Sequence, residues 1–214
     1  MVKSTGILSL VIGGVLVAAA SVATAPAQAQ TIVDEWSSVK MPPAPELKRV
    51  KIDPKTTAFL ALDFITQICN DQKPRCIASL PKVAKALEAA RAQKMLVVYS
   101  VTPGHTAKDI QAQVAPKAND PMVSFRADKF ITTDLEKILK DHGITTVIVT
   151  GVASEGAVLY TASHAAFLGM KVIVPVDGSS SSGAFNEAAA TWTLANAPGV
   201  GAATTLTRFD MIDW

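Results

Sequence analysis

Asp63 is the residue in this sequence best placed for acid–base chemistry. It directly follows the apolar run Thr56 to Leu62, which is typical of a strand buried on both faces of a sheet. A carboxylate at the buried end of such a strand is poorly solvated, so we expect a raised pKa and a role as general acid. The alternative is a carboxylate that only caps a neighbouring loop.

Lys129 is the candidate partner of Asp63, because a lysine can pair with a carboxylate or hold an anionic substrate. The alternative is a solvated lysine in front of an amphipathic helix. His105 follows a second apolar run and is a candidate for substrate contact or proton transfer, the alternative being a solvated loop histidine.

The segment Gly151 to Ala157 offers a candidate binding turn. Ser154 is expected to be the N-cap of a helix here, and it is also a candidate for substrate contact. The backbone amides of Gly156 and Ala157 at the helix start would bind an anion without any side chain. No Asp-x-His or paired-His spacing indicates a metal site, so we expect neither a metal nor another cofactor.

Alternating strands and helices position these residues. Strands are expected at 56–62, 95–101, 145–150, 171–176 and 203–206, and helices at 77–93, 133–142, 154–168 and 183–195, with 108–121 as a loop. This alternation predicts an α/β domain of three layers (αβα) with a mostly parallel sheet. Ligands bind beyond the carboxyl ends of such strands, where Asp63, His105, the turn at 151–157 and the segment 177–182 all fall.

The first 29 residues are typical of a secretory signal peptide. Lys3 supplies a basic start, residues 7–23 are almost wholly apolar, and Ala27-Gln28-Ala29 fits a signal peptidase site. The alternative is a membrane anchor, since the apolar run approaches the minimum spanning length of about 17 residues. We expect export to the periplasm or outside, an N-terminal extension at 30–55 and a single domain at 56–214.

The composition and the two cysteines agree with an exported globular domain. The chain has 20 basic and 18 acidic residues, so its charge gives no case for binding nucleic acid or an anionic membrane. Cys69 and Cys76 flank a short segment containing Pro74, which in an oxidising compartment favours a local disulfide. Free thiols, or a redox or metal role, are the alternatives.

Four segments in this order resemble the isochorismatase-like, or cysteine hydrolase, family, from about Thr56 to Ser180. They are the strand FLALDF ending in Asp63, the pattern Phe130-x-x-Thr133-x-Leu135, the turn GVAS, and VLYTA followed by an Ala-rich helix and VIVPVDG. The resemblance implies an isochorismatase-like, Rossmann-like fold and hydrolysis of a small molecule. It also implies a homo-oligomer.

The resemblance implies a Cys-Asp-Lys triad in most relatives, and only its Asp is present here, as Asp63. The family's cysteine position is Ala157 and its lysine position is Ser124, with Lys129 nearby as a candidate replacement. Thiol acyl-enzyme chemistry is therefore excluded at this position. The resemblance also places a non-proline cis peptide bond at Val152-Ala153.

Two functions remain open on the sequence. The first is a hydrolase that needs no cysteine and uses Asp63 as an acid. The resemblance implies this chemistry, because family members that lack the cysteine cleave a vinyl ether by protonation from the same aspartate. The second is a non-catalytic periplasmic binding protein that retains the pocket of a hydrolase. Both predict a small-molecule ligand, and no nucleic acid or membrane partner after signal cleavage.

Overall fold

The computed structural model describes Met1 and residues 31–214, which fall into two compact units at residues 1–42 and 43–214. Apart from Met1, the predicted signal peptide lies outside the described residues. In the first unit, α1 (Ile32–Glu35) forms one helical turn, and the Asp34 carboxylate accepts hydrogen bonds from the Thr31 amide and hydroxyl. No helix in the described part of the chain is long and apolar enough to cross a membrane.

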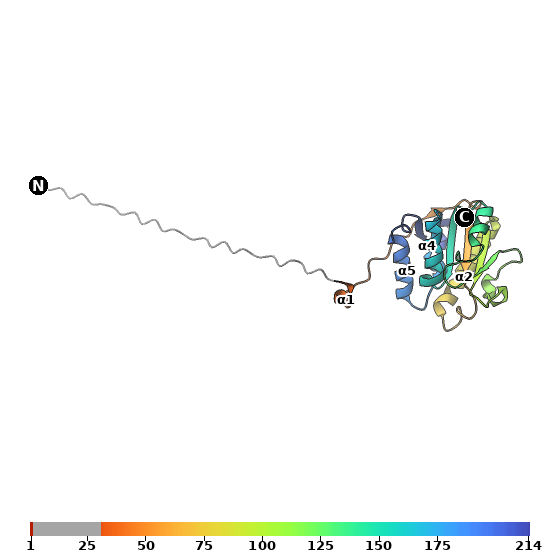
Figure 1. The fold of residues 1–214 in the computed structure, drawn as a ribbon, viewed down its shortest axis with the longest axis horizontal. Coiled ribbons are helices and arrows are strands. Elements are labelled where there is room, and N and C mark those ends of the chain that lie inside the picture. The colour runs from red at the N-terminus through yellow and green to blue at the C-terminus, as the bar shows by residue number, and fades with distance from the viewer. Residues whose placement is uncertain (2–30) are drawn as a thin grey trace. The chain divides into compact units, whose positions relative to one another are not determined.

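The second unit is built on a seven-stranded sheet (Figure 1). The five predicted strands are present as β2, β3, β5, β6 and β8, and two short strands, β4 and β7, join them. The order is β4-β3-β2-β5-β6-β8, with β7 beside β5, and all of these pairs are parallel. The bounds are β2 (Thr57–Leu62), β3 (Leu96–Val101), β4 (Met122–Ser124), β5 (Thr146–Val152), β6 (Lys171–Pro175), β7 (Ser179–Ser180) and β8 (Thr204–Thr207).

Helices cover both faces of this sheet, which confirms the predicted three-layer architecture. On one face α2 (Pro74–Ala92) packs over side chains such as Phe59 and Tyr99. On the other face α3 (Leu135–Asp141), α4 (Leu159–Phe167) and α5 (Ala184–Asn196) pack over the alternate residues of the same strands. Successive side chains of a strand point to opposite faces, so one buried strand serves both cores.

The segment predicted as an N-terminal extension contributes to the folded unit. Within this segment, strand β1 (Val50–Lys51) pairs in parallel with β9 (Ile212–Asp213) and forms a second, two-stranded sheet. An ion pair between Arg49 and Asp213, at 2.8 Å, lies beside this sheet. The chain from Pro43 onward thus forms one compact unit with the core.

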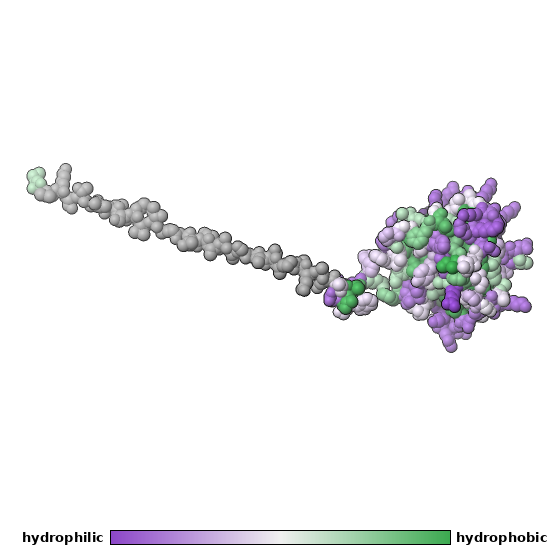
Figure 2. All heavy atoms as spheres, viewed as in Figure 1, coloured by the Kyte–Doolittle hydropathy of each residue, from purple (hydrophilic) through white to green (hydrophobic). Residues whose placement is uncertain are grey.

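The loops between strands carry short helical turns. The predicted loop at 108–121 contains two 3-10 turns, η1 (Ala107–Asp109) and η2 (Ala112–Val114). Two further 3-10 turns follow strands, η4 (Val176–Gly178) and η5 (Phe209–Met211). The visible face of the domain carries hydrophilic residues around much of its outline and apolar residues toward its middle (Figure 2).

Candidate active site at the carboxyl ends of the strands

Asp63 lies directly beyond the end of β2 and is only 2% exposed. Its backbone has φ 56, a left-handed conformation that aspartate tolerates better than most residues. Its amide donates to the carbonyl of Ser100 at 3.1 Å, and the Ser100 hydroxyl donates to Oδ1 at 2.7 Å. The neighbouring strand β3 therefore fixes both the backbone and the side chain of Asp63.

Lys129 is fully buried and its ammonium group lies 2.6 Å from Oδ2 of Asp63. The same group donates to the carbonyls of Phe125, at 2.6 Å, and Arg126, at 3.0 Å. A lysine ammonium has three N–H donors, so these three acceptors match its full capacity. The alternative interpretation from the sequence, a solvated Lys129, is therefore wrong. The loop before Lys129 folds back and presents its carbonyl groups to the ammonium group.

Burial moves the pKa values of the two groups toward each other. Burial raises the pKa of Asp63 above its usual value, and the nearby Lys129 ammonium, Ser100 hydroxyl and His105 charge oppose this only in part. Burial also lowers the pKa of Lys129, against the opposing attraction of Asp63. Converging pKa values reduce the free energy needed to move a proton from Lys129 to Asp63. The arrangement can therefore supply a protonated, acidic Asp63.

Helix α4 holds the loop that carries Lys129. The backbone amide of Lys129 donates to the Thr161 hydroxyl at 3.2 Å. One turn further along α4, Nδ1 of His164 lies 2.7 Å from a carboxylate oxygen of Asp128, and its ring stacks on Phe130 at a centroid distance of 4.7 Å. The sequence carries no signal for this contact, because it joins residues far apart in the chain.

The loop after Asp63 is tied to the loop after β3. The amide of Thr66 donates to the carbonyl of Asp109 at 2.8 Å, and the amide of Gln111 donates to the carbonyl of Phe64 at 2.9 Å. These bonds hold the segments that follow the two central strands together. They fix the direction in which the chain leaves Asp63.

The predicted disulfide between Cys69 and Cys76 is present, with a Cα–Cα distance of 5.4 Å. It joins the loop that follows Asp63 to the first turn of α2. The side chain of Gln111 also donates to the Cys69 carbonyl. Because the sequence contains two cysteines and both are in this bond, no cysteine is free to act as a nucleophile.

His105 lies in the loop that follows β3. Its Nδ1 is 3.0 Å from the Thr102 hydroxyl, and the imidazole is partly buried. A positive charge on His105 lowers the pKa of Asp63, which places the ring within electrostatic reach of that carboxyl group. Its contact with Thr102 orients the ring within the loop.

The end of β5 approaches Asp63 closely because Gly151 has no side chain. Gly151 has φ +145 and pairs with Leu62, and a Cβ placed on it would lie 2.3 Å from the Leu62 carbonyl oxygen. The peptide bond between Val152 and Ala153 is cis, as the family resemblance implied. Strand β5 thus ends in a backbone geometry that brings the turn at 151–157 against the residue before Asp63.

The binding turn predicted at Ser154, Gly156 and Ala157 differs from a regular helix start. Residues Ser154–Val158 form a π-helical turn, η3, whose N-cap is Ala153, so the prediction of Ser154 as the N-cap is wrong. The Ser154 hydroxyl instead donates to the Ser179 hydroxyl at 3.2 Å. The Gly156 amide donates to the Ala153 carbonyl at 3.0 Å, so it is not free to bind an anion. Its non-helical backbone (φ −113, ψ −105) explains the irregular start.

Three buried polar atoms beside this turn make no hydrogen bond with any residue that the structure describes. They are Oε2 of Glu155 and the hydroxyls of Ser180 and Ser181. The other carboxylate oxygen of Glu155 accepts a hydrogen bond from Asn186 at 2.9 Å. Ser180 is paired with Val152, so these groups lie on the far side of the β5 end from Asp63. The serine run at 179–182 was the only sequence signal for them.

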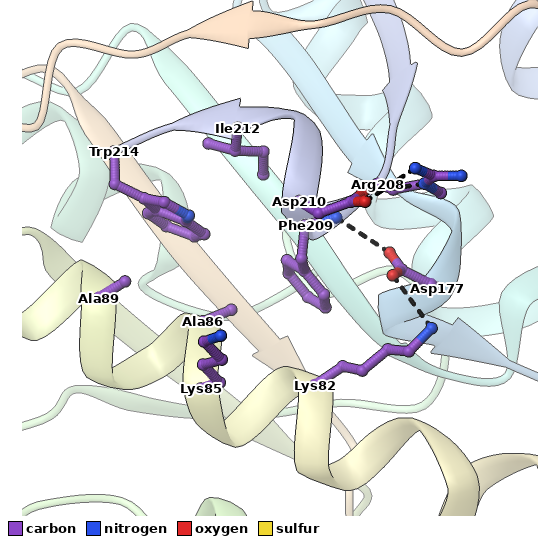
Figure 3. Close-up of a pocket in the computed structure, with 10 residues that line it drawn as sticks. All are labelled: Lys82, Lys85, Ala86, Ala89, Asp177, Arg208, Phe209, Asp210, Ile212 and Trp214. Atoms are coloured by element: carbon purple, nitrogen blue, oxygen red, sulfur yellow. Dashed lines mark hydrogen bonds and ion pairs between the residues drawn. The ribbon is translucent and has the colours of Figure 1, made fainter.

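The acid–base pair is closed off from solvent. Asp63 and Lys129 do not line the pocket of about 640 Å³ that lies between α2 and the C-terminal segment (Figure 3). Among the described residues, no group of three or more His, Cys, Asp or Glu side chains is arranged to hold a metal ion. The chemistry available here is proton transfer between two buried groups and whatever contacts them.

Comparisons with known proteins give one family and one fold. The family described as Isochorismatase domain matches residues 57–207. No curated protein sequence matches the chain significantly. An isochorismatase family protein from Desulfovibrio vulgaris has a similar structure (TM-score 0.66, 18% identity, 72% of this chain and 95% of that chain covered).

Two similar structures carry the names of amide hydrolases. One is N-carbamoylsarcosine amidase from Thermoplasma acidophilum (TM-score 0.64, 22% identity, 74% and 99% covered). The other is a nicotinamidase from Staphylococcus aureus (TM-score 0.64, 20% identity, 72% and 99% covered). At these identities the likeness establishes a shared fold.

Proposed function

We propose that this chain, which belongs to the isochorismatase domain family, is an exported hydrolase that acts on a small molecule by cysteine-independent acid–base chemistry. The observation that carries the proposal is the contact of 2.6 Å between Lys129 and Asp63. Burial raises the pKa of Asp63 and lowers that of Lys129, which makes Asp63 better suited to donate a proton than a solvated carboxylate would be.

Ala157 supports a mechanism without a covalent thiol intermediate. By resemblance it occupies the family's nucleophile position, and its methyl group is buried and unreactive. Both cysteines form the disulfide between Cys69 and Cys76. The chain therefore has no thiolate to attack a carbonyl group, and we assign the attack on the substrate to water.

Asp63 is the proton donor in the reaction that we propose. A proton moves from Lys129 to Asp63, and the carboxyl group then protonates the substrate, for example the double bond of a vinyl ether. Water adds to the resulting cation and returns a proton to Asp63, and the adduct separates into an alcohol and a carbonyl compound. The Ser100 hydroxyl, which donates to Oδ1, stabilises the Asp63 carboxylate while the cation exists, and the proton that water returns to Asp63 passes back to Lys129 to close the cycle.

Of the remaining predicted site residues, His105, Ser154 and Ala157 are assigned to substrate binding, whereas the Gly156 amide is already bonded to the Ala153 carbonyl. His105 is oriented by Thr102, and Ser154 and Ala157 lie in the turn that follows β5. The unpartnered groups of Glu155 and Ser180 are buried beside this turn, on the side away from Asp63. Adjacent strands lie about 4.8 Å apart, so a substrate that crosses two strand spacings, from β2 past β5 to β7, is about 10 Å long.

A non-catalytic binding protein is the second candidate function. Asp63 is 2% exposed and Lys129 is not exposed at all, which favours a structural role for the pair. A retained ion pair that only closes the end of the sheet would leave ligand binding to other surfaces. The two candidates therefore differ in whether Asp63 ever meets a substrate.

Export and self-association belong to the same proposal. The disulfide suits an oxidising compartment such as the periplasm, which agrees with the signal peptide predicted at 1–29. Several large apolar side chains are exposed on α4 and α5, and contiguous apolar surface is typical of an interface between copies of a chain. They are Tyr160, Phe167, Phe185 and Trp192. We propose a homo-oligomer with a small-molecule ligand and with no nucleic acid or membrane partner.

A turnover screen tests the function directly. The exported full chain and Asp63→Asn are compared on small amides, esters and vinyl ethers, with Asp141→Asn, at an exposed acid, as the matched control. We expect turnover in the native chain and in Asp141→Asn, and a loss of about 10²-fold or more in folded Asp63→Asn. Circular dichroism establishes that each variant is folded.

Two outcomes would reject the hydrolase. Undiminished turnover in folded Asp63→Asn would remove Asp63 from the reaction. Ligand binding detected by thermal shift without turnover in any of the three proteins would establish the binding protein instead.

A further inference from the structure

A pocket lies away from Asp63, between α2 and the C-terminal segment. Its volume is about 640 Å³, which is within the usual range for small-molecule sites. One wall is α2, with Lys82, Lys85, Ala86 and Ala89. The opposite wall is formed after β6 and β8 by Asp177, Arg208, Phe209, Asp210, Ile212 and Trp214 (Figure 3).

Two aromatic rings of the pocket are held in place by the core. Phe209 and Trp214 both stack on the buried Phe59, at centroid distances of 6.3 and 6.4 Å. The Phe209 ring also packs against Gly178, where a Cβ would lie 2.5 Å from Cζ of the ring. The Phe209 amide donates to a carboxylate oxygen of Asp177 at 3.1 Å. The aromatic wall is therefore preformed.

Among the charged side chains of the pocket, one cation has no acidic side chain as a partner among the described residues. Arg208 forms two hydrogen bonds with Asp210, at 2.9 and 2.8 Å, and Lys82 lies 3.3 Å from Asp177. Lys85 forms no ion pair with any residue in the part of the chain that the structure describes. Lys85 lines the pocket from α2, and Figure 3 shows it beside Ala86 on this helix.

We propose that this pocket is a second binding site, distinct from Asp63, for a small aromatic carboxylate. The ring of the ligand stacks against Phe209 and Trp214, because offset stacking on a fixed ring adds to the gain from burying apolar area. Its carboxylate pairs with Lys85, the cation that no described acid neutralises. A cationic ligand is disfavoured, because the two acids of the pocket already have basic partners.

Trp214 provides a local reporter of occupancy. The sequence has three tryptophans, and the other two, Trp36 and Trp192, are 70% and 44% exposed. Replacing both with Phe leaves Trp214 as the single tryptophan, which can be excited selectively, at little expense of stability. Titrating this variant of the full chain with benzoate is expected to change the Trp214 emission saturably.

Three comparison ligands test the chemistry of the site. Benzamide keeps the ring without the charge, cyclohexanecarboxylate keeps the charge without the aromatic ring, and benzylamine reverses the charge. Benzoate is expected to bind more tightly than all three. Lys85→Gln in the single-tryptophan background is expected to weaken benzoate binding about threefold, the effect of an exposed ion pair. Lys85→Glu is expected to weaken it further.

Lys171→Gln serves as the matched control, because Lys171 is an exposed lysine on β6 outside the pocket. Asp63→Asn is expected to leave benzoate binding unchanged, which separates this site from the proposed hydrolase site. The proposal is overturned if benzoate causes no saturable change in Trp214 emission. Equal binding of benzoate and benzamide, or an equal effect of Lys85→Gln and Lys171→Gln, would also overturn it.

Discussion

The ammonium group of Lys129 lies 2.6 Å from a carboxylate oxygen of Asp63, and both side chains are buried. Each group neutralises the charge of the other, and the rest of their hydrogen-bonding capacity is also used. The remaining Lys129 donors bind the carbonyls of Phe125 and Arg126, and the second oxygen of Asp63 accepts a hydrogen bond from Ser100. Breaking such a pair leaves an uncompensated charge in the interior. The energetics of the pair can therefore be tested without knowing a substrate.

A double-mutant cycle on this pair is expected to be strongly non-additive. Asp63→Asn and Lys129→Met should each lower the free energy of unfolding by about 3–5 kcal/mol, because each strands one buried charge or polar group. The double variant strands neither charge, so its loss should be well below the sum. Urea denaturation of the four proteins measures the coupling. Additive losses would mean that the two side chains do not interact in solution.

The pKa of Asp63 is expected to lie above its usual value of 3.8 and to rise further when Lys129 is replaced by Met. Burial raises this pKa, while the charge and hydrogen bond of Lys129 lower it, so removing the lysine removes an opposing influence. Carbon-13 NMR of the aspartate carboxyl groups measures both values. A lower Asp63 pKa in Lys129→Met would contradict the arrangement.

The same shift predicts how stability depends on pH. In the window above pH 3.8, up to the raised pKa, folded Asp63 retains a proton that the unfolded chain has lost. The contribution of Asp63 to the free energy of unfolding is therefore fully present below pH 3.8 and is lost as the pH rises through the raised pKa. The free energy of unfolding is measured across this window for the native chain and for Asp63→Asn. The difference between the two proteins isolates the pH dependence that Asp63 contributes, and it should fall as the pH rises. A difference that grows with pH would contradict the raised pKa.

The sequence predicted the positions of Asp63 and His105 because the carboxyl ends of parallel strands meet at one edge of the sheet. Lys129 was predicted only from its closeness to the family's lysine position, since the curled loop that buries it leaves no periodic pattern. The N-cap prediction for Ser154 failed because the Gly156 backbone is non-helical, which local propensity does not register. Strands as short as β7, Ser179–Ser180, are below the length at which alternation can be recognised.

Thr161→Val is expected to destabilise the loop that carries Lys129. Valine matches threonine in shape but removes the hydroxyl that accepts the Lys129 amide at 3.2 Å, leaving a buried donor unpaired. An unpaired buried donor costs about 1–3 kcal/mol, and Thr161→Ser, which keeps the hydroxyl, should lose less. The Asp63 pKa reports the position of the Lys129 ammonium group. It should rise in Thr161→Val, because a displaced ammonium group lowers this pKa less. An unchanged pKa would show that other contacts suffice to place Lys129.

Replacing both cysteines by serine is expected to lower the free energy of unfolding by about 2.5 kcal/mol in the chain-entropy account of disulfides. The bond joins the loop after Asp63 to α2, so the loop should also exchange its amide hydrogens faster. Denaturation with and without reductant provides the control, because reductant should affect only the native chain. Equal stability of the oxidised native chain and the variant would show that the disulfide adds nothing to the fold.

Gly151→Ala is expected to be the most damaging glycine substitution near the site. The new Cβ would lie 2.3 Å from the Leu62 carbonyl oxygen, and both atoms belong to rigid, paired strands, so β2 and β5 must separate next to Asp63. We expect a loss of about 3 kcal/mol in the free energy of unfolding from overpacking and backbone strain together.

Gly143→Ala is the matched control, because Gly143 also has a positive φ (+66) but has open space where a Cβ would lie. Its loss should be about 1 kcal/mol, from backbone strain alone. If the two variants lose the same amount, the close approach of β5 to the residue before Asp63 does not constrain the site. A larger loss in Gly151→Ala, accompanied by a shift in the Asp63 pKa, would show that this contact sets the geometry of the acid–base pair.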